Sequence, residues 1–210
     1  MIKISTGNSR YQCHLTILST GNAFMQDTFN KLSQTTIFLH WLVGITIIGM
    51  LTLGLYMVQN EAYGLYDIHK SIGVLIFSFI LARLAWRIKQ GWLKPVREYN
   101  KVEQTLSALV HYILLIGSVL IPLTGLMMSI GGGHGLDIFA FNLIPENHSL
   151  ENPTEALPLN ETISSLGAGL HSIISYLLIV ALLLHIAGAL KHHFMDNDAT
   201  LRRMLGKKIG

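Results

Sequence analysis

The segment LHSIISYLLIVALLLHIAGAL, residues 170–190, contains no Asp, Glu, Lys or Arg. A helix of about 20 apolar residues is long enough to cross a lipid bilayer. Three more apolar runs lie at 36–58, 68–86 and 106–130, and the fourth extends over 166–190. The sequence therefore predicts an all-α integral membrane protein that forms a four-helix bundle.

The composition of the whole chain agrees with this class. Half of the 210 residues are hydrophobic and 13% are charged, against about 25% charged in an average soluble domain. These values exclude a disordered chain and do not suit a cytosolic enzyme. We attribute the formal net charge of +3 to basic loops at a membrane surface, so that lipid, and no nucleic acid, is the expected partner.

We divide the chain into an N-terminal extension (1–35), a membrane domain (36–190) and a basic tail (191–210). The extension is polar and lacks the apolar core of a secretory signal. Met25 opens the stretch MQDTFNKLSQTTIFLHW, which is a plausible natural start. Our hypothesis is that residues 1–24 are a disordered tail or the product of a start codon assigned too far upstream, and N-terminal sequencing tests it.

The basic residues predict the orientation of the bundle. All of the 15 Lys and Arg residues except Lys70 and Arg83 fall in the extension, in the loop after the second helix or in the tail. The other two loops, 59–67 and 131–165, contain none. Because cytoplasmic loops carry the excess of Lys and Arg, we expect both termini in the cytoplasm.

Two histidines share one face of the last predicted helix. His171 and His185 are 14 residues apart, which corresponds to almost four turns and to about 21 Å along the axis. One of them therefore lies near each membrane surface. A histidine inside a membrane helix is costly without a partner. Such residues indicate either hydrogen bonding across the bundle or the binding of a cofactor.

Each of these histidines has a candidate partner at its own depth. His69 begins the second helix on the outer side with His171, and His40 lies near the inner start of the first helix with His185. His111, on the third helix, is also at the inner depth and could replace His40 or His185. Two stacked bis-histidine sites, His69 with His171 and His40 with His185, are the simplest arrangement that includes these four residues.

Paired imidazoles in an apolar setting favour haem b as the cofactor. The porphyrin supplies four nitrogens to the iron and needs only two axial ligands, and it fits between the helices of a bundle. Zinc and copper usually take closer ligand sets that include Cys or carboxylates. Covalent c-type attachment is excluded because the chain has no CxxCH motif.

Four glycines lie one helical turn from the four histidines. They are Gly44, Gly73, Gly167 and Gly188. The absence of a side chain at these positions would allow a macrocycle to approach the backbone. The alternative interpretation is that these small residues pack membrane helices together.

Several long motifs resemble the bacterial cytochrome b561 family. They are FLHW (38–41), DIHKSIG (67–73), LVHYILLIGSVLIPLTGLMMS (109–129) and LHSIISYLLIVALLLHIAGALKHHFMDNDATLRRM (170–204). The resemblance extends from Met25 to the C-terminus and implies a four-helix cytochrome of the inner membrane with two haem b groups. It implies that His40 and His185 bind the cytoplasmic-side haem, and that His69 and His171 bind the periplasmic-side haem.

The resemblance also suggests partners. One branch of the family oxidises superoxide at the periplasmic face and passes the electron to ubiquinone. Positive potential would steer such an anion, whereas Lys70 is the only basic residue in or beside the outer loops here. We predict electron transfer across or within the membrane, with the quinone pool as mobile partner and an unidentified periplasmic donor or acceptor.

Two other functions would also place histidines inside membrane helices. A cytochrome b subunit of a larger oxidoreductase complex would use the same haem scaffold. A non-redox transporter with a histidine proton relay would require intramembrane carboxylates, which the helix interiors lack.

Polar residues at the inner end are candidate contacts for a quinone. They are Trp41, Arg83, Arg87, His111, His192 and His193. Histidine exchanges protons near neutral pH, as quinone reduction requires. His111 could instead support the inner haem, and the arginines could reach the interface or pair with a haem propionate. The basic residues at 202–208 are expected to face anionic headgroups.

The outer loop 131–165 is expected to cover the outer haem. It contains His134 and His148, for which a metal-binding role is the less favoured interpretation.

Overall fold

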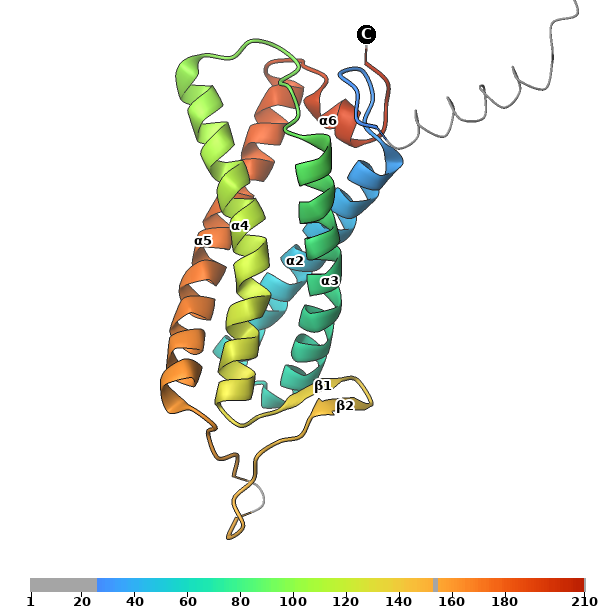
Figure 1. The fold of residues 1–210 in the computed structure, drawn as a ribbon. Helices are drawn as coiled ribbons and strands as arrows, with labels where there is room; N and C mark the ends of the chain where they lie inside the picture. Colours follow the sequence, from blue (N-terminus) through green and yellow to red (C-terminus); the bar gives the residue numbers. More distant parts are fainter. Residues whose placement is uncertain (1–25, 153–154, 210) are drawn as a thin grey trace, which may run out of the picture.

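The computed structural model describes residues 26–152 and 155–209. Four long helices form the bundle shown in Figure 1. They are α2 (Gln34–Asn60), α3 (Tyr66–Gln90), α4 (Lys101–Gly131) and α5 (Glu161–Phe194), and a short 3-10 helix, η1 (Tyr63–Leu65), joins α2 to α3. All four are long and apolar enough to cross a membrane. The prediction of four membrane helices is confirmed, whereas the hypothesis about residues 1–24 concerns a part of the chain outside the described range.

Three of the four long helices begin at a polar residue that caps the first turn. Ser33, Asn100 and Asn160 each accept a hydrogen bond through the side chain from a backbone N–H three residues later. Such caps satisfy donors that have no partner inside the helix. The helices therefore start at these polar residues, a few positions before the apolar runs that we used to predict them.

The C-terminal tail is more structured than we predicted. Helix α5 continues to Phe194, so His192 and His193 lie on its last turn. Hydropathy detects only the apolar part of this helix, whereas its backbone hydrogen bonding continues beyond that part. The rest of the tail forms a short helix, α6 (Thr200–Met204). The backbone N–H of Ile209 donates to the carbonyl of Asn30 at 2.9 Å. The two ends of the described chain therefore lie together at one end of the bundle (Figure 1).

The bundle consists of two helical hairpins, α2 with α3 and α4 with α5. The first hairpin has a buried apolar cluster of Val43, Ile76 and Ile80. The second is joined by close backbone approach, because a Cβ at Gly167 would lie 2.6 Å from the backbone nitrogen of Met128. For Gly167, the packing interpretation is therefore correct, and our interpretation of this glycine as room for a macrocycle is wrong.

The loop between α4 and α5, for which we keep the name outer loop from its predicted side, contains a two-stranded antiparallel hairpin that we did not predict. Its strands are β1 (Leu136–Ile138) and β2 (Phe141–Ile144). The hairpin docks on α3 through the fully buried Ser71, whose hydroxyl accepts from the Phe139 backbone at 2.8 Å and donates to the Asp137 carbonyl at 3.3 Å. The loop therefore covers the outer end of α3, two residues from His69.

Candidate functional site

The structure brings His69 of α3 and His171 of α5 together at the outer end of the bundle. Their ring centroids are 6.3 Å apart. The Nδ1 atom of His171 is 3.0 Å from the carbonyl oxygen of Ile121 on α4 and 3.2 Å from the hydroxyl of Thr124. A carbonyl only accepts, so Nδ1 carries the proton and Nε2 keeps the lone pair that a metal requires.

Two glycines that we did not single out lie beside this outer pair. A Cβ at Gly125 of α4 would be 3.2 Å from Cε1 of His171, and a Cβ at Gly54 of α2 would be 3.6 Å from Cε1 of His69. A side chain at Gly125 would therefore crowd the His171 ring in its present position. In addition, Nδ1 of His69 is buried and has no hydrogen-bond partner within the described part of the chain.

Three histidines meet at the inner end of the bundle. The ring centroids of His40 on α2 and His185 on α5 are 6.1 Å apart. His111 on α4 lies 5.1 Å from His185 with the two rings nearly perpendicular. Its Nδ1 is 2.6 Å from the carbonyl oxygen of Ser107 in its own helix. His40 thus faces His185, His69 faces His171, and His111 also lies beside His185.

The glycines predicted near these histidines have different surroundings. A Cβ at Gly44 or Gly188, one turn from His40 and His185, would meet nothing within 4 Å. A Cβ at Gly73 would be 3.7 Å from a methionine side chain, which is ordinary contact. The structure therefore leaves open space at the two glycines that lie one turn from the inner histidines.

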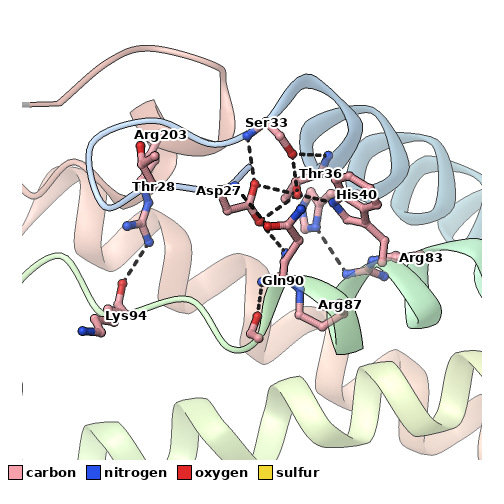
Figure 2. A network of polar contacts seen from close by, with 12 residues as sticks. Asp27, Thr28, Ser33, Thr36, His40, Arg83, Arg87, Gln90, Lys94 and Arg203 are labelled. Atoms are coloured by element: carbon pink, nitrogen blue, oxygen red, sulfur yellow. Dashed lines mark hydrogen bonds and ion pairs between the residues drawn. The ribbon is translucent and has the colours of Figure 1, made fainter. Parts of the chain in front are cut away.

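Arg83 of α3 points toward the inner pair (Figure 2). Its Nη2 is 3.4 Å from Nδ1 of His40. Among residues 26–152 and 155–209, Arg83 forms no ion pair with a carboxylate. It is a partly buried cation whose only hydrogen-bonding neighbour in this range is a histidine.

The segment just before α2 is fixed to α3 through Asp27 (Figure 2). The Asp27 side chain, 4% exposed, accepts from the Ser33 backbone at 2.9 Å, from the Thr36 hydroxyl at 2.8 Å and from Arg87 at 3.0 Å. Burial opposes ionisation, but these hydrogen bonds and the Arg87 charge hold the pKa of Asp27 below its ordinary value. Arg87, predicted as a quinone contact, is therefore bound to Asp27.

Two other candidate quinone contacts, Trp41 and His192, have different hydrogen-bond partners. The indole N–H of Trp41 donates to the Met204 carbonyl at 3.0 Å. The His192 ring lies 4.6 Å from the ring of Tyr99, and its Nδ1 is 2.8 Å from Asp196. Trp41 is thus engaged with α6, whereas His192 belongs to a polar cluster at the end of α5.

One basic residue of the tail has a different environment from the one we predicted. Arg203 is 5% exposed, and its guanidinium donates to the carbonyls of Phe29 and Lys94 at 3.3 and 3.2 Å. Our expectation that it faces lipid headgroups is wrong, because its guanidinium supplies hydrogen-bond donors to these two loop carbonyls instead. Arg202, Lys207 and Lys208 remain exposed.

The histidines of the outer loop show no metal-site geometry. His148 Nε2 is 3.2 Å from Glu146, and both side chains are substantially exposed. Over the described ranges, no group of three or more His, Cys, Asp or Glu residues is arranged to hold a metal ion. The histidine pairs between the helices therefore suit a metal whose other ligands are supplied by a prosthetic group.

Four apolar helices with a pair of facing histidines near each end are the arrangement of a membrane b-type cytochrome. The model of the prokaryotic cytochrome b561 family matches residues 31–207. The chain is 31% identical to "Cytochrome b561 homolog 2" of Escherichia coli (strain K12) over 179 residues, which cover 80% of this chain and 87% of that protein. It is 28% identical to "Cytochrome b561 homolog 1" of the same organism over 189 residues, 85% of this chain and 99% of that protein.

The chain therefore belongs to the prokaryotic cytochrome b561 family. It is a multi-pass protein of the bacterial inner membrane that binds b-type haem and transfers electrons.

Proposed function

We propose that this cytochrome holds two haem b groups, one between His40 and His185 and one between His69 and His171. One observation carries the proposal. An iron with an imidazole nitrogen about 2 Å away on each side separates the two ring centroids by about 6 Å. The two pairs in the structure have centroids 6.1 and 6.3 Å apart.

The same geometry argues against His111 as an axial ligand. Its ring centroid is 5.1 Å from that of His185, about 1 Å less than two axial imidazoles require. The ring also turns its Nδ1 to the Ser107 carbonyl of its own helix. His111 is therefore a neighbour of the inner site, and His40 is the partner of His185.

The residues around both pairs fit a porphyrin. Space is open at Gly44 and Gly188, one turn from the inner histidines, and the outer ligand His69 has a buried nitrogen without a partner among the described residues. When bound, each haem supplies a one-electron centre. The chain orients the ligands, most directly through the Ile121 carbonyl that fixes the tautomer of His171.

We place the outer site at the periplasm and the inner site at the cytoplasm, and the quinone pool is the proposed mobile partner. The distribution of Lys and Arg supports this orientation. A superoxide-oxidising activity is not part of the proposal. Lys70, the single basic residue near the outer site, is 3.2 Å from Asp67 and donates to the His134 carbonyl at 3.3 Å, so its charge is already compensated.

The haem content of the purified full-length chain tests the two-site proposal. We expect two haems per chain with a b-type reduced-minus-oxidised spectrum. His171→Ala is expected to lose the outer haem and His185→Ala the inner one. A single haem per chain, or full content in either variant, would overturn the ligand assignment.

Stopped-flow reduction by a short-chain ubiquinol tests the quinone partner separately. We expect ubiquinol to reduce the haems of the oxidised protein. If it does not, the quinone proposal fails while the haem assignment stands. Stable copurification of a second polypeptide would favour the alternative of a cytochrome subunit in a larger complex.

A further inference from the structure

The inner site has a cation, Arg83, that no carboxylate of residues 26–152 and 155–209 neutralises. Arg83 is partly buried in a membrane helix, and its only hydrogen-bonding neighbour within the described chain is Nδ1 of His40 at 3.4 Å. An isolated charge in such a setting is costly and needs an anionic or hydrogen-bonding partner.

That neighbour cannot serve Arg83 once His40 binds iron. A neutral imidazole that coordinates through Nε2 keeps its proton on Nδ1. A guanidinium has only N–H donors. Two donors would then face each other, so Arg83 requires another acceptor in the cofactor-loaded protein.

The carboxylate of Asp27, in the network of Figure 2, is already engaged. Asp27 accepts hydrogen bonds from the Ser33 backbone, the Thr36 hydroxyl and Arg87, which lies one turn after Arg83. Asp27 thus compensates Arg87, and the acceptor for Arg83 has to come from another source.

Other carboxylates of the inner end are also occupied by nearby donors. Glu103 and Asp196 both pair with Lys191. Asp198 accepts from the Tyr99 hydroxyl and from the Thr200 backbone. These contacts leave Arg83 as the cation next to a ligand histidine that still needs a negatively charged group.

We propose that Arg83 is a carboxylate-binding site, and that its ligand is a propionate group of the porphyrin held by His40 and His185. This inference rests on the proposed function of those two histidines. Guanidinium suits the role because its fork of donors matches a carboxylate and stays charged in an apolar setting. Arg83 then orients the inner haem by its edge while the histidines hold its iron.

A residue-against-ligand cycle tests the inference without measuring electron transfer. The full-length chain and its Arg83→Gln variant are loaded either with natural haem or with the dimethyl ester, in which both propionates are uncharged. The readout is the rate at which the inner haem passes to excess apomyoglobin. The release rate of the outer haem and the variant Lys89→Gln, which removes an exposed cation of the same helix, serve as controls.

With natural haem, we expect Arg83→Gln to release the inner haem roughly tenfold faster or more, as the loss of a charged hydrogen bond implies. With the ester, we expect no difference between variant and parent. Arg83→Lys, which keeps the charge but not the fork, is expected to be intermediate.

Two results would overturn the inference. One is an unchanged release rate of natural haem in Arg83→Gln, and the other is equal acceleration for natural haem and ester. Both require a bound inner haem, so they are distinguishable from failure of the proposed function, in which no inner haem is bound or His40→Ala retains it.

Discussion

The Nδ1 atom of His171 on α5 lies 3.0 Å from the carbonyl oxygen of Ile121 on α4. Helix α4 thereby orients a proposed iron ligand without supplying a ligand itself at the outer site. Hydrogen bonds of this kind set the tautomer and direction of a ligand histidine. Because Gly125 lies one turn after Ile121 and a Cβ there would be 3.2 Å from the same ring, the α4 surface around it should be sensitive to added volume.

Gly125→Ala is expected to lower the occupancy of the outer haem. The new Cβ would lie 3.2 Å from Cε1 of His171, and crowding of this kind typically costs about 1–3 kcal/mol. Haem content per chain and the absorption spectrum measure the effect. Gly49→Ala is the matched control because a Cβ there meets nothing within 4 Å. Equal occupancy in both variants would show that the ring has room to move.

His111→Ala is expected to keep both haems, whereas His40→Ala should lose the inner one. The reason is the difference in centroid distance to His185, 5.1 Å for His111 and 6.1 Å for His40. Haem quantification of the purified variants measures it. The opposite result, with haem lost in His111→Ala and retained in His40→Ala, would transfer the inner ligand to α4.

Asp27→Asn is expected to destabilise the inner end of the bundle at neutral pH by about 2 kcal/mol, because Arg87 loses a charged partner. The folded pKa of Asp27 lies below its ordinary value of 3.8. Its contribution is therefore present above that ordinary value and is lost as the pH falls through the folded pKa. Thermal unfolding of the detergent-solubilised protein between pH 7 and about pH 3 measures both effects.

The matched control for this pH dependence is Asp67→Asn, since the Asp67 side chain is 77% exposed. We expect the parent and Asp67→Asn to lose stability together at acidic pH, while Asp27→Asn shows a flatter profile. Parallel profiles in all three proteins would mean that Asp27 does not stabilise the junction of α2 and α3.

We expect the C-terminus to lie in the cytoplasm, so that a reporter fused there is active only if it is one that folds in the cytoplasm. The physical reason is the excess of Lys and Arg at the end of the bundle where both described chain ends lie. A periplasmic reporter inserted at Leu150, which is fully exposed in the outer loop, should be active. Periplasmic activity at the C-terminus would reverse the proposed orientation of the two sites.

The sequence was sufficient to predict features that depend on one helix at a time. The four spans follow from local hydropathy, and the relation of His171 to His185 follows from the helical repeat. The depth of His40 and His69 follows from their position at a helix start. These quantities do not depend on how neighbouring helices are rotated. In the structure, the ring centroids of the two predicted pairs are 6.1 and 6.3 Å apart.

Contacts between helices could not be predicted in the same way. A side chain at Gly125 would crowd His171, and Gly167 packs against α4, yet both are merely glycines in apolar helices when the sequence is considered alone. The difference arises from the rotation of α4 against α5, which no local pattern encodes. Asp27 was missed because the polar segment around it resembles an unstructured extension until its partners on α3 are known.

The division of the bundle into two hairpins has a consequence for biosynthesis. Each histidine pair takes one member from the α2–α3 hairpin and the other from α5, so that porphyrin would cross-link both halves at two depths. We therefore expect chains inserted during iron or porphyrin starvation to keep separable halves and to be preferred substrates of membrane proteases. The supply of cofactor would then regulate the abundance of this cytochrome after translation, by a route separate from transcription.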